Sequence, residues 1–150
     1  MESKIITIKN KKQSDIPKLI EKEYSVFSRV STLTHVVDYA YLGKKEDNGD
    51  TVHYCLLAAV HKNTMLQLVE AFEENKLKIT TVSFPIYDMI CLSSLYQDDY
   101  DHLNRLMIDF GVGGTRVVAF SDGIPVYSRN IDIGFHTYVQ HRKPSESRTL

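Results

Sequence analysis

The chain has 150 residues, of which 43% are hydrophobic and 25% charged, and its formal net charge is −1 at pH 7. A chain of this length forms about one ordinary domain, and its composition is typical of a soluble globular protein, which excludes a largely disordered chain. The balanced charge excludes a global field that would recruit nucleic acid or an anionic membrane. Two cysteines, Cys55 and Cys91, are too few for a disulfide framework and indicate a cytoplasmic protein with reduced thiols.

Neither a membrane span nor a secretory signal is expected. The longest apolar run, Tyr54 to Val60, is much shorter than the ~20 residues that a membrane helix needs. The N-terminus has no long hydrophobic stretch of the kind that secretory signals contain.

The first elements that the sequence predicts are a strand and a helix. Isoleucines at 5, 6 and 8 stand among polar residues and predict a short strand. Ser14 or Asp15 can cap a following helix, and Pro17 suits its first turn because N–H groups there lack internal partners. Apolar residues at a helical period extend this helix, namely Ile16, Leu19, Ile20, Tyr24 and Phe27.

A long hairpin is predicted next, with strands over residues 33–42 and 51–61. The Asn48-Gly49 pair favours the positive φ angles of a tight turn. This turn predicts Val36 opposite His61 and Leu42 opposite Cys55, and it places His35 and His61 on opposite faces. The second strand is apolar on both faces, which predicts a central strand covered by helices.

Two more helices and a strand follow. Thr64 and Gln67 have the spacing of a capping box at the start of a helix with apolar residues to position 72. Residues 76–84 predict a strand. Ser83 and Pro85 open a helix that is apolar all around at residues 89–92, so we expect it to be buried, with Cys91 inside it. The polar residues 97–102 are the predicted boundary in the chain.

Three consecutive strands are predicted beyond this boundary, over residues 105–110, 116–120 and 124–130. A glycine-rich turn joins the first two, and glycines there let backbone N–H groups approach a phosphate. Thr115 can add a donor, and Asp109 can hold Mg²⁺ through water. The candidate phosphate and magnesium residues are Asp109, Gly111, Gly113, Gly114 and Thr115. A tight hairpin without a ligand explains the local pattern equally well.

Other chemistry is not predicted. Six histidines are scattered, and none has metal-ligand spacing with another histidine, cysteine or carboxylate on a helix. The serines do not form a Gly-x-Ser-x-Gly elbow. We therefore predict no metal site and assign no catalytic residue.

The pattern Asp109-x-Gly111-x-x-x-Thr115, followed by Gly123 and by Arg129 to Gly134, resembles the second half of an actin-like ATPase. More narrowly, it is similar to the PilM family of bacterial type IV pilus assembly proteins, which are related to the cell-division protein FtsA. Residues 52–85 also resemble the small inserted subdomain of that family. One departure is Phe135, which stands where the family has a second glycine.

The resemblance implies an α/β fold that is a fragment of the actin-like, ribonuclease H-like architecture. Residues 1–97 would be the inserted α/β subdomain, residues 103–140 the first antiparallel strands of the second half, and residues 141–150 a flexible tail. Family members are roughly twice this length, so we expect either a piece of a longer protein or a shortened relative.

The resemblance implies a cytoplasmic scaffold of type IV pilus assembly that binds partner proteins and lies at the inner face of the membrane through them. Family members bind a short N-terminal peptide of an inner-membrane partner. Only one of the two phosphate loops of an actin-like ATPase has a counterpart here, so no cofactor is required and we do not expect this chain alone to hydrolyse ATP with Mg²⁺. Uncovered strand faces also predict self-association, including by exchange of elements.

Two alternatives stay open. One is a nucleotide-binding ATPase fragment of the actin and sugar-kinase superfamily, which would use the glycine-rich turn. The other is an FtsA-like cell-division adaptor, which needs an amphipathic terminal helix as a membrane tether. Residues 141–150 lack an apolar face, so we expect no vesicle binding and no membrane insertion. The balanced charge leads us to expect no nucleic-acid partner.

Overall fold

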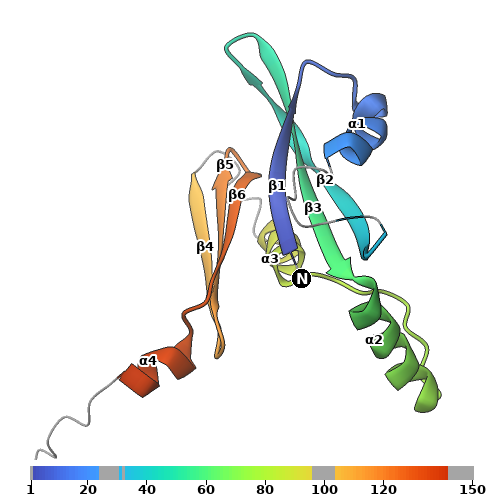
Figure 1. Cartoon of the computed structure of the whole chain (residues 1–150). Coiled ribbons are helices and arrows are strands. Elements are labelled where there is room, and N and C mark those ends of the chain that lie inside the picture. The colour runs from blue at the N-terminus through green and yellow to red at the C-terminus, as the bar shows by residue number, and fades with distance from the viewer. Residues whose placement is uncertain (1, 24–30, 32, 96–103, 142–150) are drawn as a thin grey trace, which may run out of the picture.

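The structure is a computed structural model that describes residues 2–23, 31, 33–95 and 104–141. It is a mixed α/β protein with two three-stranded antiparallel sheets, of strand order β1-β3-β2 and β4-β5-β6 (Figure 1). The elements in chain order are β1 (Glu2–Lys9), the 3-10 turn η1 (Gln13–Asp15), α1 (Ile16–Glu23), β2 (His35–Asp47), β3 (Asp50–His61), α2 (Lys62–Glu74), α3 (Pro85–Ser94), β4 (Arg105–Phe110), β5 (Thr115–Ser121), β6 (Ile124–Ile131) and α4 (Phe135–His141).

The hairpin β2–β3 confirms the predicted turn. Asn48 and Gly49 have φ angles of 52° and 87°, in the left-handed region that an Asn-Gly pair adopts most easily. Strand β3 pairs with β1 on one side and β2 on the other, so it is central, as its apolar sequence predicts. The predicted strand at residues 5–8 and the helix that begins at Ile16 are also present, whereas Tyr24 and Phe27 lie outside the described residues.

Beyond the residues next to the turn, the predicted register of this hairpin is wrong and the pairing is shifted by one residue. A bulge lies between Tyr41 and Gly43, so Tyr41 pairs with Cys55 and His35 pairs with His61. Glycine accommodates the bulge because Gly43 has a φ angle of 137°. His35 and His61 therefore lie on the same face, with ring centroids 5.2 Å apart, and the prediction of opposite faces is incorrect.

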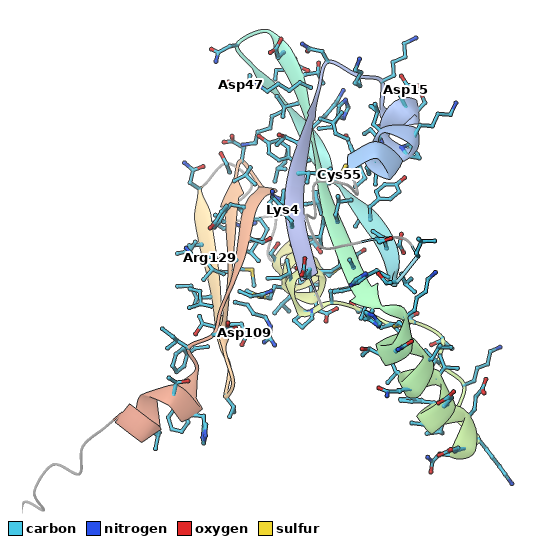
Figure 2. All side chains as sticks on the ribbon, in the orientation of Figure 1. Lys4, Asp15, Asp47, Cys55, Asp109 and Arg129 are labelled. Atoms are coloured by element: carbon cyan, nitrogen blue, oxygen red, sulfur yellow. The ribbon has the colours of Figure 1, made fainter. Side chains whose placement is uncertain are left out.

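Each face of β3 contributes to a different part of the core, as predicted. Cys55 and Leu57 pack under α1 and form one cluster with Ile16 and Ile20 (Cys55 is labelled in Figure 2). Leu56 points to the other face. It joins a second cluster that connects the two sheets and α3, with Ile86, Met89, Val118 and Phe120. The second cluster is the apolar contact that holds β4-β5-β6 beside the first sheet.

Helix α3 begins at Pro85 as predicted, but it is not buried on all sides. Ile86, Met89 and Ser93 face the core, whereas Cys91 is exposed and Leu92 is 48% exposed. The prediction of a buried Cys91 is therefore wrong. A run of apolar residues around a helix indicates burial only if the fold supplies cover on every side, and the described residues cover one side of α3.

Helix α2 begins earlier than predicted. His61, not Thr64, is its N-cap, and the ring Nδ1 of His61 accepts a hydrogen bond from the Asn63 N–H at 3.3 Å. The helix contains no buried residue, and Leu66 and Phe72 on it are 57% and 39% exposed. Figure 1 shows α2 projecting away from both sheets.

The strand predicted for residues 76–84 is absent. Residues 77–84 connect α2 to α3 without regular secondary structure. Strand-forming residues complete a strand only when they pair with a neighbouring edge, and this segment pairs with neither described sheet. The predicted boundary at 97–102 and most of the predicted tail at 141–150 lie outside the described residues.

Candidate functional site

The glycine-rich turn joins two neighbouring antiparallel strands, as predicted. Phe110 at the end of β4 pairs with Thr115 at the start of β5. The Gly111 N–H closes the turn by donating to the Gly114 carbonyl oxygen at 3.0 Å. The five candidate residues from Asp109 to Thr115 are therefore brought together at one end of the second sheet.

Asp109 is paired with a cation from the same sheet. Its Oδ2 accepts a hydrogen bond from Arg116 Nη1 at 2.7 Å, and both side chains are partly exposed. The two residues are also direct neighbours across β4 and β5. This ion pair gives the Asp109 carboxylate a structural role at the position where the sequence predicts a magnesium ligand.

Helix α4 is bonded to the turn. The backbone N–H groups of Phe135 and His136 donate to the carbonyl oxygens of Gly111 and Val112, each at 3.0 Å. Gly134 makes this close approach feasible, because a Cβ there would overlap Gly114 N and both carbonyl oxygens. Only glycine fits at position 134, where the PilM-like pattern also has glycine. Phe135, which departs from that pattern, points outward and is 55% exposed.

Thr115 is also engaged within the chain. Its hydroxyl donates to the Ile133 carbonyl oxygen at 2.5 Å, which ties β5 to the segment that leads into α4. The hydroxyl, the Asp109 carboxylate and two turn carbonyls therefore have partners without a ligand. The hydrogen bonds of the turn therefore connect β4, β5 and α4.

A cavity of about 310 Å³ lies beside the turn. Its lining brings residues 111–116 together with residues 130–132 at the end of β6, residues 84–86 and Ser3. The charged side chains that line it are Arg116 and Asp132, and Arg116 already pairs with Asp109. The neighbourhood of the cavity therefore carries no excess of positive charge for a phosphate.

The described residues contain no group of three or more His, Cys, Asp or Glu side chains that could hold a metal ion. His53 is buried and has two partners: its Nε2 bonds to the Lys11 carbonyl oxygen at 2.8 Å, and its Nδ1 bonds to Tyr41 at 3.1 Å. A carbonyl oxygen can only accept, so Nε2 donates in the bond to Lys11. His53 therefore fastens the chain after β1 to the first sheet.

A second hollow region, which the sequence does not predict as a site, lies beside residues 79–84. Two adjoining cavities of about 250 and 330 Å³ share Asp38, Ala58, Thr81, Val82 and Phe84 in their linings. Their linings are mostly apolar, and both are open to solvent. We call these two cavities together the 79–84 groove. The strand-like sequence that lacks a strand partner is the signal that could have indicated it.

The two small antiparallel sheets, joined through α3, define a mixed α/β fold that matches solved structures although its sequence gives little sign of kinship. No family model matches the chain, and no curated protein matches it significantly. Eighteen chains of solved structures do match.

One of these chains belongs to the PilM-PilN type IV pilus biogenesis complex. It superimposes with a TM-score of 0.73 at 13% sequence identity, over 93% of this chain and 41% of that chain. At this identity the likeness concerns the fold. The PilM-like resemblance over part of the family's length is thereby confirmed, and this chain spans about two fifths of the length of its solved counterpart. Within the described residues, no helix is long and apolar enough to cross a membrane.

Proposed function

We propose that this chain is a PilM-like binding component of type IV pilus assembly, at the cytoplasmic face of the membrane. The observation that supports this is the shared fold over 93% of the chain with a member of the PilM-PilN complex. In this proposal, residues 1–97 correspond to the inserted subdomain of an actin-like protein, and residues 103–140 correspond to the opening strands of its second half.

The bonding of the glycine-rich turn favours binding of a protein over hydrolysis of a nucleotide. Asp109 and Thr115 have partners within the chain. The Arg116 cation beside the cavity is paired with Asp109. A magnesium ion at Asp109 or a phosphate at the Thr115 hydroxyl would have to displace these contacts.

The 79–84 groove is the proposed partner site. The backbone of residues 79–83 forms no hydrogen bond with any described residue, so its donors and acceptors are free to pair with an added strand. Ala58, Val82 and Phe84 supply apolar lining to both cavities of the groove. This geometry suits an extended peptide with apolar side chains, such as an N-terminal segment of a PilN-type partner.

A labelled peptide from the cytoplasmic N-terminal segment of the PilN-type protein of the same organism tests this proposal by fluorescence anisotropy. We expect saturable binding that Val82→Lys weakens by about 10-fold or more, since a charge would enter an apolar site. Val112→Lys is the matched control, because Val112 is 71% exposed and outside the groove. A peptide that fails to bind at about 100 μM, or that binds both variants equally, contradicts the proposed site.

A further inference from the structure

We infer that β4 is a self-pairing edge: two copies of this chain join β4 to β4 in antiparallel fashion and make one continuous six-stranded sheet. This inference goes beyond the proposed partner binding and does not depend on it. Among the described residues, β4 has a ladder neighbour on one side, which is β5. The opposite side of β4 is an open edge, with the unpaired backbone groups that favour strand addition.

The unpaired groups of β4 belong to the residues whose side chains lie on the outer, apolar face. Because the Gly111 N–H bonds inward to Gly114, the alternation of an antiparallel ladder directs the N–H and C=O groups of Leu106, Ile108 and Phe110 away from β5. These three side chains are 60%, 60% and 54% exposed. Met107, by contrast, packs toward the second core cluster.

The outer face continues across the sheet. Leu106 pairs with Ala119, Ile108 pairs with Val117, and Tyr127 of β6 extends the row beyond Ala119. No described helix packs on this face, as Figure 1 shows for the side of the second sheet away from α3.

Charge complementarity selects the register of the pairing. When Met107 faces Met107 of the second copy, Arg105 of each copy lies opposite Asp109 of the other, and Leu106 lies opposite Ile108. Opposite charges and apolar pairs directly across two strands are both favourable. The register also keeps the outer faces of both copies on one side of the sheet, because paired residues share a face.

Arg105 gains an acceptor from this pairing. Its guanidinium lies 5.1 Å from the Phe120 ring centroid, and its Nε and Nη2 atoms are buried without a hydrogen-bond partner among the described residues. Asp109 uses Oδ2 for Arg116, which leaves Oδ1 to accept from Arg105 of the second copy. These nitrogens are buried within the single chain, so the contact requires the Arg105 side chain to turn from Phe120 toward the open edge of β4.

Light scattering coupled to size-exclusion chromatography of the full chain tests the pairing between about 10 and about 500 μM. We expect a concentration-dependent mass that approaches twice 17.2 kDa. Ile108→Lys should raise the dissociation constant by about 100-fold, because it places a lysine from each copy at the joined edge. Tyr127→Lys adds the same charge to the same face two strands away and should leave the dimer intact.

Cysteine cross-linking tests the register, in a Cys91→Ser background because Cys91 is an exposed thiol. Met107→Cys should form a disulfide-linked dimer, since symmetric non-hydrogen-bonded pairs bring Cα atoms to about 4.5 Å. Leu106→Cys and Ile108→Cys should cross-link when mixed and not when oxidised separately, which keeps the test valid if Met107→Cys fails to fold. A monomer at every concentration overturns the inference, as does a dimer that Tyr127→Lys disrupts equally or that neither cysteine pairing traps.

Discussion

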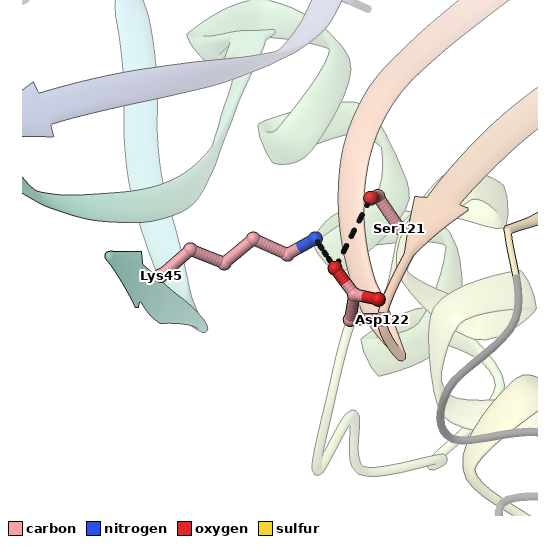
Figure 3. A network of polar contacts seen from close by, with 3 residues as sticks. All are labelled: Lys45, Ser121 and Asp122. Carbon is pink, nitrogen blue, oxygen red and sulfur yellow. Dashed lines mark hydrogen bonds and ion pairs between the residues drawn. The ribbon is translucent and has the colours of Figure 1, made fainter. Parts of the chain in front are cut away.

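Lys45 Nζ lies 2.6 Å from Asp122 Oδ2, and this ion pair connects β2 of the first sheet to the turn between β5 and β6 of the second (Figure 3). The Ser121 hydroxyl contacts the same carboxylate oxygen at 3.4 Å. The bulge in β2 creates this contact. Before it, Ala40 and Leu42 face the second sheet, and after it the alternation is reversed so that Lys45 faces that way. Without the bulge, Lys44 would take this place.

The ion pair between Lys45 and Asp122 is expected to contribute modestly to stability. The Lys45 side chain is 18% exposed and that of Asp122 is 65% exposed, so water screens the pair on one side. A double-mutant cycle with Lys45→Met and Asp122→Asn should give a coupling of about 0.5 kcal/mol in the free energy of unfolding, which falls at high salt. Asparagine suits the φ angle of 48° at position 122. A coupling of zero at low salt would show that the pair does not link the sheets energetically.

Gly134→Ala should weaken the attachment of α4 to the glycine-rich turn. The added methyl group would overlap the backbone of Gly111, Val112 and Gly114, so we expect a loss of about 2 kcal/mol in the free energy of unfolding. Hydrogen exchange should also accelerate at the Phe135 and His136 amides, which donate to the turn.

Gly113→Ala is the matched control for Gly134→Ala. A Cβ at position 113 meets nothing within 4 Å. The free energy of unfolding of this variant should therefore be close to that of the wild type, and exchange at the α4 amides should stay slow. If the two alanine variants behaved alike, α4 would not depend on the close approach at Gly134.

The two cysteines should differ sharply in reactivity. Cys91 is exposed and should react with a thiol-specific disulfide reagent in the native protein, whereas Cys55 is buried and should react only after unfolding. Burial raises the pKa of the Cys55 thiol from 9.0 to about 11. Rapid labelling of both thiols under native conditions would contradict this placement of β3.

The raised pKa of Cys55 also predicts a pH dependence of stability. The folded state binds this proton more tightly than the unfolded state, so the contribution is complete below pH 9 and is lost as the pH rises toward about 11. Urea unfolding across this range should show a decline that the Cys55→Ala variant, less stable at every pH, does not share. Identical slopes for the two proteins would assign the decline to other groups.

Mg-ATP is expected to leave the melting temperature unchanged at millimolar nucleotide. Asp109 and Thr115 have partners in the chain, and the Arg116 cation beside the cavity is paired. Thermal shift measurements of the wild type and of Asp109→Ala check this. A rise in the melting temperature that Asp109→Ala abolishes would instead support the nucleotide-binding alternative.

Local chemistry was sufficient to predict much of the fold. The Asn48-Gly49 turn, the burial of β3 on both faces and the strands on either side of Gly111 follow from residue types and short-range spacing. The candidate residues of the glycine-rich turn were likewise predicted together, because a tight turn between paired strands must bring its neighbours close. Their bonding to α4 could not be predicted, since it depends on residues about 20 positions further along the chain.

The amino-acid sequence by itself determined which segments form strands around tight turns, because those preferences act between neighbouring residues. Only the tertiary structure decided the register of β2, the exposure of Cys91 and the unpaired course of residues 79–84. The position of a bulge such as the one in β2 depends on the side chains that the shifted residues contact. The burial of a helix residue such as Cys91 depends on which other elements pack against that side of the helix. A strand needs an edge to join, and these conditions arise only when distant segments assemble.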